Sequence, residues 1–273
     1  MTDISSPPFK SPIGTEQLLS WSGKTWFVIT AAGQLAFIAF IVGFYGPSTF
    51  SGNFAEWNEK PLIDGHIEGD TAGNAMFAMH VTIATVMTLS GLLQLTPQIR
   101  NRAPAFHRAT GKVFLVTACF LALGGFWLVF VRGTQLSTIS AIATSLDGAL
   151  ILIFAGMTVR YALQRRIAIH QVWAMRLFMV ANGVWFLRVM MMAWIILAQG
   201  PVGMNRTLSG PTDIALSFGC YLIPLAIYEI YRRAGESGSA RVKVAAAGLV
   251  FTSAGITAIG VFGTVAFMWL PYM

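Results

Sequence analysis

Charged residues are scarce in this chain of 273 residues. It contains 18 Lys and Arg and 11 Asp and Glu, so only 11% of its residues carry a charge, against roughly 25% in a typical soluble domain. An intrinsically disordered chain would combine many charges with few apolar residues, which is the opposite of this composition. The scarcity of charge therefore excludes a disordered chain and a soluble nucleotide-binding enzyme.

Cysteine is almost absent as well. Cys119 and Cys220 lie in separate apolar stretches at different expected depths, so we expect neither a disulfide nor a CxxC-type metal site. Acidic residues are fewer than basic ones, which gives a net charge of +7 and a pI near 9.8. In a membrane protein this excess reflects basic cytoplasmic loops. We therefore expect no nucleic-acid partner.

Apolar residues dominate what is present, at 55% of the chain with a mean hydropathy of +0.66. Crossing a bilayer core takes about 20 helical residues, and continuous apolar stretches of that length form helices rather than barrel strands. The sequence predicts an all-α bundle with seven spans in the lipid bilayer. These are approximately Thr25–Gly46, Ala75–Leu95, Val113–Val131, Ile139–Val159, His170–Ala198, Ile214–Ile230 and Val244–Leu270.

The basic residues set the predicted orientation. Most of the 18 Lys and Arg residues fall on the side of the N-terminus, which predicts a bacterial inner-membrane protein with its N-terminus inside and its C-terminus outside. Residues 1–24 are then a cytoplasmic tail without a cleavable signal pattern, and residues 25–273 form the membrane domain. The first span acts as an uncleaved anchor, and residues 47–74 form an acidic external loop.

Polar side chains inside or beside the spans are the candidate functional residues, because an ionisable group in a span costs about 2.5 to 3.5 kcal/mol on the insertion scale. His170 and Arg188 are expected on one face of the fifth span, about 27 Å apart. Asp147 and Arg188 are expected to form an intramembrane ion pair. The cytoplasmic cluster comprises Gln94, His107, Arg108, His170, Trp173 and Arg176, and the outer cluster comprises His80, Asp147 and Arg188.

Several of these residues carry a family resemblance. His80 and the segments GLLQLTPQIR, AFHRATGKVF and IHQVWAMRLF, followed by Leu187 and Arg188, resemble the bacterial predicted membrane proteins known as domain of unknown function 2306. The resemblance covers about residues 76–188. The chain departs from the family pattern at two positions. Lys112 stands where an Arg commonly follows the glycine, and Gln171 stands where a basic residue often follows the histidine. The resemblance implies a compact helical core and no established activity. The positions that match are His80, Gln94, His107, Arg108, Gly111, His170, Trp173, Arg176 and Arg188.

The sharpest functional hypothesis is a b-type haem at the cytoplasmic end. His107 and His170 would bind the iron axially, and Arg108 or Arg176 would pair with the propionates. Gly111 and Ala118 on the third span would leave room for the macrocycle. In the simpler alternative, the two histidines bond to loop carbonyls, Gln94 or lipid headgroups, and the arginines anchor the bundle to anionic lipid.

Three further hypotheses stay open. Trp173, the arginines and the groove of the third span could hold a quinone or lipid. His80, Asp147 and His66 could form a metal-dependent hydrolase site, although an exported acidic loop needs only solvation. The small residues of 244–270 could pack against membrane-protein partners, which would make the chain an accessory subunit, or against the bundle itself. The sequence offers no Ser or Cys nucleophile with a paired base, the pattern that would indicate covalent catalysis.

Overall fold

The computed structural model describes residues 14–59 and 64–273 of the chain. Every regular element within these ranges is helical, which confirms the all-α prediction. The α-helices are α1 (Thr15–Ser51), α2 (Thr71–Leu95), α3 (Pro97–Arg102), α4 (Pro104–Phe130), α5 (Thr138–Leu163), α6 (Ile167–Ala181), α7 (Gly183–Leu197), α8 (Pro211–Glu236) and α9 (Ala240–Gly263). A π-helical segment, Thr264–Trp269, continues α9, and short 3-10 segments lie at Phe54–Asn58 and Leu270–Tyr272.

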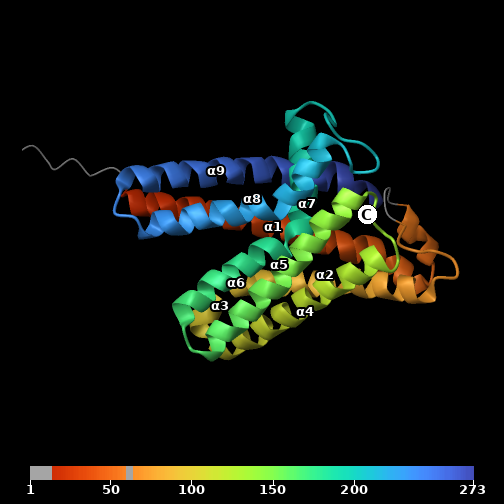
Figure 1. The fold of residues 1–273 in the computed structure, drawn as a ribbon, viewed down its shortest axis with the longest axis horizontal. Helices are drawn as coiled ribbons and strands as arrows, with labels where there is room; N and C mark the ends of the chain where they lie inside the picture. Colours follow the sequence, from red (N-terminus) through yellow and green to blue (C-terminus); the bar gives the residue numbers. More distant parts are fainter. Residues whose placement is uncertain (1–13, 60–63) are drawn as a thin grey trace, which may run out of the picture.

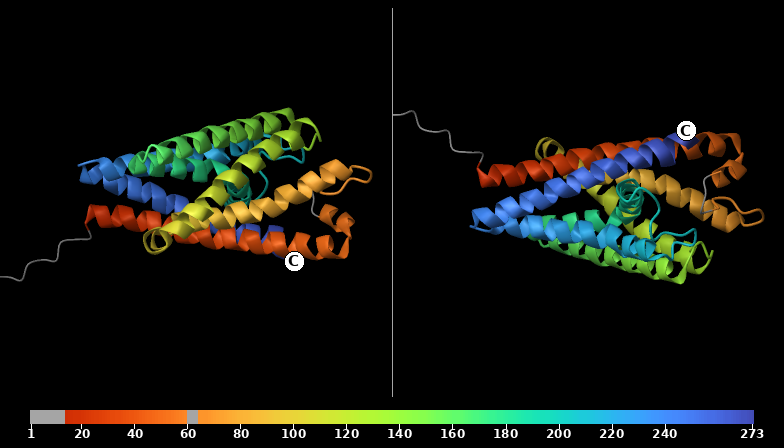
Figure 2. Two further views of the ribbon diagram at one scale, coloured as in Figure 1. Left: turned by 90° about the horizontal axis from the view of Figure 1, so that it is seen from below. Right: turned by 90° about the horizontal axis from the view of Figure 1, so that it is seen from above.

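The helices form two groups that diverge toward one end of the molecule (Figure 1). The terminal arm consists of α1, α8 and α9, and the right-hand view of Figure 2 shows α9 between the other two. The central arm consists of α2 to α6, and α7 leaves the end of α6 and packs against α8 and α9. Arg100, Arg160 and Arg233 all lie on helix ends at the diverging end, which we call the basic end.

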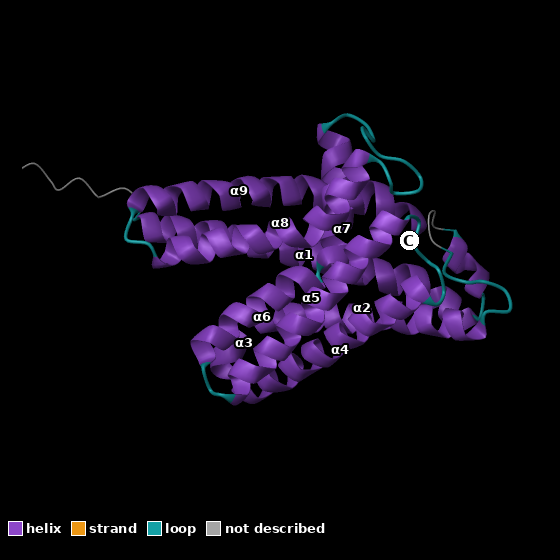
Figure 3. Ribbon diagram, in the orientation of Figure 1, coloured by secondary structure: helices purple, strands orange, loops and turns teal. Residues whose placement is uncertain are grey.

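Within the described residues, six helices are long and apolar enough to cross a membrane, and α6 with α7 makes a seventh span if this bent pair is counted as one. They coincide with the seven apolar stretches of the sequence. Figure 3 shows how little of the described chain lies in loops between them. The chain is therefore a multi-pass helical membrane protein. The orientation with the N-terminus inside stays a prediction.

The first helix begins earlier than predicted. Residues 14–24 of the predicted tail are described, and from Thr15 they belong to α1; residues 1–13 lie outside the described part of the chain. The start of α1 packs against α9, which stabilises these residues as a helix. Leu19 is buried against Ala246 and Ala247 of α9, and Glu16 accepts from Lys243 Nζ at 2.9 Å.

The external loop is shorter than the predicted 47–74, since α1 runs to Ser51 and α2 begins at Thr71; residues 60–63 lie outside the described ranges. Its acidic end is not merely solvated. Arg132, which follows α4, pairs with Asp70 at 3.0 Å and donates to Asn74 Oδ1 at 2.8 Å. The Arg132 side chain is only 2% exposed, so it fastens the loop and the start of α2 to α4.

The fifth predicted span is not one straight helix. It breaks at Asn182, where α6 and α7 meet at an angle of 56°. The Asn182 side chain is 2% exposed, donates to the Phe178 carbonyl at 2.8 Å and accepts from Gln34 Nε2 at 2.9 Å. These hydrogen bonds satisfy the Asn182 amide, which would find no hydrogen-bond partner in lipid. The prediction that His170 and Arg188 share one helix face is therefore wrong.

Candidate functional site

The predicted cytoplasmic residues lie at the basic end, as two sets on different helices. The first set, on α2 and α4, comprises Gln94, His107 and Arg108, and the second, on α6, comprises His170, Trp173 and Arg176. His107 of the first set is close enough to His170 of the second for the two side chains to interact electrostatically.

The first set is a helix-packing contact. The Gln94 amide donates to the His107 carbonyl at 3.1 Å and to Thr110 Oγ1 at 2.6 Å. A Cβ added to Gly111 would meet the Gln94 side-chain oxygen at 3.0 Å, and Ala118 is 1% exposed. The groove expected to admit a ligand along α4 is therefore filled at these two positions by the protein itself.

The two histidines have different surroundings. Nδ1 of His170 donates to the Thr158 carbonyl at 3.0 Å, so Nε2 is the nitrogen left to accept a bond. Nδ1 of His107 is buried and has no hydrogen-bond partner among the described residues. Arg108 is exposed. The haem prediction stays untested by this geometry.

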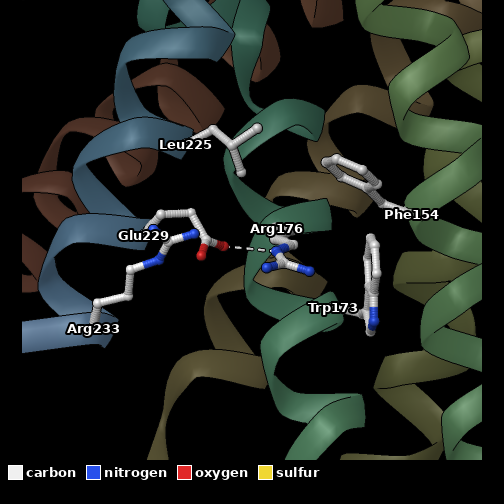
Figure 4. A pocket seen from close by; sticks show the side chains of 6 residues that line it. All are labelled: Phe154, Trp173, Arg176, Leu225, Glu229 and Arg233. Carbon is white, nitrogen blue, oxygen red and sulfur yellow. Dashed lines mark hydrogen bonds and ion pairs between the residues drawn. The ribbon is translucent and has the colours of Figure 1, made fainter. Parts of the chain in front are cut away.

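The second set forms a charged contact between α6 and α8. Arg176 Nε donates to Glu229 Oε1 at 2.7 Å, and its guanidinium lies 4.4 Å from the centroid of the Trp173 ring (Figure 4). Arg232 also pairs with Glu229, at 3.2 Å. The sequence analysis missed Glu229, although a carboxylate just inside the predicted sixth span calls for a cationic partner on a neighbouring helix.

A pocket of about 240 Å³ lies beside this ion pair. Figure 4 shows Phe154 from α5 and Trp173 from α6 facing Leu225, Glu229 and Arg233 of α8 across it. The pocket therefore lies between the central arm and α8 of the terminal arm, at the basic end.

A larger cavity of about 460 Å³ lies between the two arms. Its walls come from α1, α6, α7, α8 and α9, with Leu95 and Pro97 from the α2–α3 junction. Among the described residues of the lining, Lys24 carries the one charged side chain. The apolar lining includes Trp26, Phe27, Met175, Met179, Phe186, Met190, Ile223 and Ile227.

The predicted outer cluster is dispersed. His80 faces α4, since its Nδ1 lies 3.5 Å from a Cβ added to Gly124, whereas Asp147 contacts Gly183 at the start of α7. Arg188 donates to the Val184 carbonyl at 2.9 Å, and no described ion pair joins it to Asp147. The predicted Asp147–Arg188 pair is therefore wrong, because the bend at Asn182 redirects Arg188.

The three predicted metal ligands, His80, Asp147 and His66, do not come together in the structure. Within residues 14–59 and 64–273, no three His, Cys, Asp or Glu side chains are placed to hold a metal ion. His66 stacks on Phe54 in the loop, while Asp147 sits deep in the bundle.

The small residues of 244–270 serve the bundle at several positions. A Cβ on Gly260 would meet the Val189 carbonyl of α7, and one on Gly263 would meet Ile196 at 2.6 Å. Gly248 and Gly255 open outward with nothing within 4 Å of an added Cβ. Intramolecular packing therefore accounts for the buried positions, and a partner at the open ones stays a prediction.

Comparison with known proteins gives one match. A family model described as "Predicted membrane protein (DUF2306)" matches residues 77–231, more than half of the chain. The match begins within α2 and runs through most of α8, so it extends past the predicted boundary at Arg188 and includes Glu229. No curated protein and no solved structure matches the chain.

Proposed function

Because the chain belongs to the DUF2306 family of predicted membrane proteins, whose description assigns no activity, we propose its function from its own cavity: it binds a hydrocarbon-tailed amphiphile between the two arms. An isoprenoid quinone and a phospholipid share this chemistry. Either would enter from the surrounding bilayer.

The observation that carries the proposal is the apolar cavity of about 460 Å³. Ligand sites are typically about 300 to 1,000 Å³, mostly apolar, with a few placed polar groups. Met175, Met179 and Met190 lie in its wall, and unbranched thioether side chains adapt to a flexible chain more readily than branched ones. This lining suits a hydrocarbon tail.

The polar end of the cavity suits a headgroup. Lys24 and Ser20 come from the first turns of α1, and Tyr228 and Tyr231 from the last turns of α8, at the basic end. A cation beside hydroxyl groups favours a phosphate or a quinone carbonyl, because both accept charge-assisted hydrogen bonds.

Retention of lipid by cavity variants tests the proposal. Ser253 lines the cavity, whereas its neighbour Thr252 is exposed on the outer face of α9. The wild type, Ser253→Phe and Thr252→Phe are purified by the same detergent exchange, and retained lipids are counted by mass spectrometry. We expect Ser253→Phe to lose most of one lipid species that the other two proteins retain. Equal retention in all three would contradict the proposal, and the species identifies quinone or phospholipid.

Haem b between His107 and His170 is the second candidate. One observation favours it: the bond from His170 Nδ1 to a backbone carbonyl fixes the tautomer that leaves Nε2 for iron. Its test is a reduced-minus-oxidised absorption spectrum of the purified protein. A Soret and α-band change that is lost in His107→Ala would support haem, and a featureless visible spectrum would exclude it.

A further inference from the structure

The broken span places a helix N-terminus inside the bundle, directly against a carboxylate. A Cβ added to Gly183, the first residue of α7, would meet Asp147 Oδ2 at 2.5 Å and the carboxyl carbon at 3.3 Å. The Cα–Cβ bond of a helical residue tilts toward the helix N-terminus, so this carboxylate lies at the positive end of the α7 dipole.

Among residues 14–59 and 64–273, no ion pair or side-chain hydrogen bond compensates a negative charge on Asp147. Its side chain is only 9% exposed, and Oδ1 is buried without a hydrogen-bond partner in the described chain. Arg188 is turned away, with its guanidinium 5.8 Å from the Phe37 ring centroid. An isolated charge in a span is costly, and neutralisation by a proton is the usual alternative.

The described groups around Asp147 include no cation. From α8, Cys220 and Tyr221 are close enough to interact with the carboxylate. From α4, the Phe126 ring packs against the adjacent Gly148, and from α6, His170 bonds to Thr158, about 16 Å along α5 at 1.5 Å per residue. In the part of the chain that the structure describes, the start of the α7 backbone is thus the feature beside Asp147 that favours the ionised form.

We propose that Asp147 is a proton-binding site whose occupancy is coupled to the bend at Asn182. With the span bent, the N-terminus of α7 stabilises the carboxylate. When a proton from water binds a carboxylate oxygen, the neutral acid no longer needs that positive end, and the span can straighten. On release the proton returns to water. The coupling is reciprocal: whatever bends the span favours proton release.

Unpartnered polar atoms around the break fit this role. The Gln34 side chain, which holds Asn182, is fully buried and its Oε1 has no partner in the described residues. The Tyr221 hydroxyl is unpartnered too, in a side chain that is 1% exposed. An amide oxygen can accept a hydrogen bond from a protonated carboxyl or from water, and a tyrosine hydroxyl can donate or accept one. Because α6 belongs to the central arm and α7 packs on α8 and α9, straightening would move the arms relative to each other.

Infrared difference spectroscopy tests the proton site. Full-length protein in nanodiscs is taken from alkaline to acidic pH, and the carbonyl stretch of a buried protonated carboxyl is recorded. We expect such a band in the wild type and its loss in Asp147→Asn. Asp213→Asn is the control and should retain the band; Asp213 is a buried aspartate whose carboxylate accepts hydrogen bonds from the Asn205 and Gly210 backbone amides. Should Asp147→Asn fail to fold, wild-type protein labelled with ¹³C-aspartate must show the band shifted. A band that no aspartate label shifts, or one kept in Asp147→Asn, would overturn the site.

Electron–electron distance measurements test the coupling. Spin labels replace Leu163 and Arg241, both exposed at the basic end of different arms, after Cys119→Ala and Cys220→Ala. We expect the distance to change between alkaline and acidic pH, and Asp147→Asn to show the acidic-pH distance at both. A distance independent of pH in protein that shows the infrared band would overturn the coupling. Neither result depends on which amphiphile the cavity holds.

Discussion

At the residue scale, a hydrogen-bonded pair of buried amide side chains lies at the bend between α6 and α7. Gln34 and Asn182 come from helices 148 positions apart in the chain, and both side chains are almost completely buried. An amide removed from water without a partner costs about 1 to 3 kcal/mol. The pair therefore determines where α1 meets the break, and neither residue is replaceable by an apolar one without leaving the other unsatisfied.

We predict that the two amides are energetically coupled. Asn182→Ala leaves Gln34 Nε2 without its acceptor, so we expect a loss of about 1 to 3 kcal/mol in unfolding free energy. A double-mutant cycle with Gln34→Ala should give a coupling between about 0.6 kcal/mol, the average for hydrogen-bonded pairs in a membrane bundle, and about 1.7 kcal/mol, the largest value. Unfolding of the purified protein in mixed micelles measures it. The cycle of Asp147→Asn with Arg188→Gln is the control and should show no coupling; coupling there and none at the amides would contradict the geometry.

At the element scale, the contact between α5 and the start of α7 depends on glycine at one position. Gly183 has no Cβ, and this absence is what allows the Asp147 carboxylate to approach the start of α7. Gly156 on α5 has nothing within 4 Å of an added Cβ. The two positions thus differ in what a methyl group would meet.

Alanine at these two glycines should have opposite effects. Gly183→Ala forces Asp147 or α7 to move, so we expect destabilisation by about 1 to 3 kcal/mol, as in other overpacked cores. Gly156→Ala should be neutral or stabilising by up to about 1 kcal/mol, because alanine is the better helix former. Thermal unfolding compares them, and Asp147→Ala should relieve the loss in Gly183→Ala. Equal effects of the two substitutions would show that the contact is absent.

The sequence predicted existence and approximate position for every span, because an apolar stretch of about 20 residues in lipid has few alternatives to a helix. It did not predict the break, because Asn and Gly also occur inside continuous helices, so the presence of Asn182 and Gly183 alone does not indicate one. The hydrogen bond that Asn182 accepts at the break comes from Gln34, which is far away in the chain. The same limit applies to the site: Arg176 and Trp173 were found as polar residues near a span end, whereas their partner Glu229 lies on another helix.

At the scale of the whole molecule, the basic end is also the end at which the arms diverge and at which the cavity has its polar groups. The excess of Lys and Arg predicts that this end faces the cytoplasm. An amphiphile would then have its headgroup at the inner leaflet, where anionic lipid attracts basic residues.

Cysteine labelling tests that orientation. Val202 lies in the α7–α8 connection, 58% exposed, and Gly238 lies exposed between α8 and α9. In a background without Cys119 and Cys220, an impermeant maleimide applied to intact cells should label Val202→Cys. It should label Gly238→Cys only after the membrane is permeabilised. The reverse pattern would invert the topology.

The central claim is that the space between the arms holds a hydrocarbon tail, and photo-crosslinking tests it most directly. Purified protein in nanodiscs is irradiated with a phospholipid and, separately, an isoprenoid quinone analogue carrying a diazirine in the tail, and the labelled residues are mapped by mass spectrometry. We predict that one of the two probes labels Met175, Met179 and Met190 in the cavity wall, and that Ser253→Phe abolishes this labelling while Thr252→Phe does not. Labelling confined to outward-facing residues such as Val28 and Val116, which are 64% and 69% exposed, would contradict the claim.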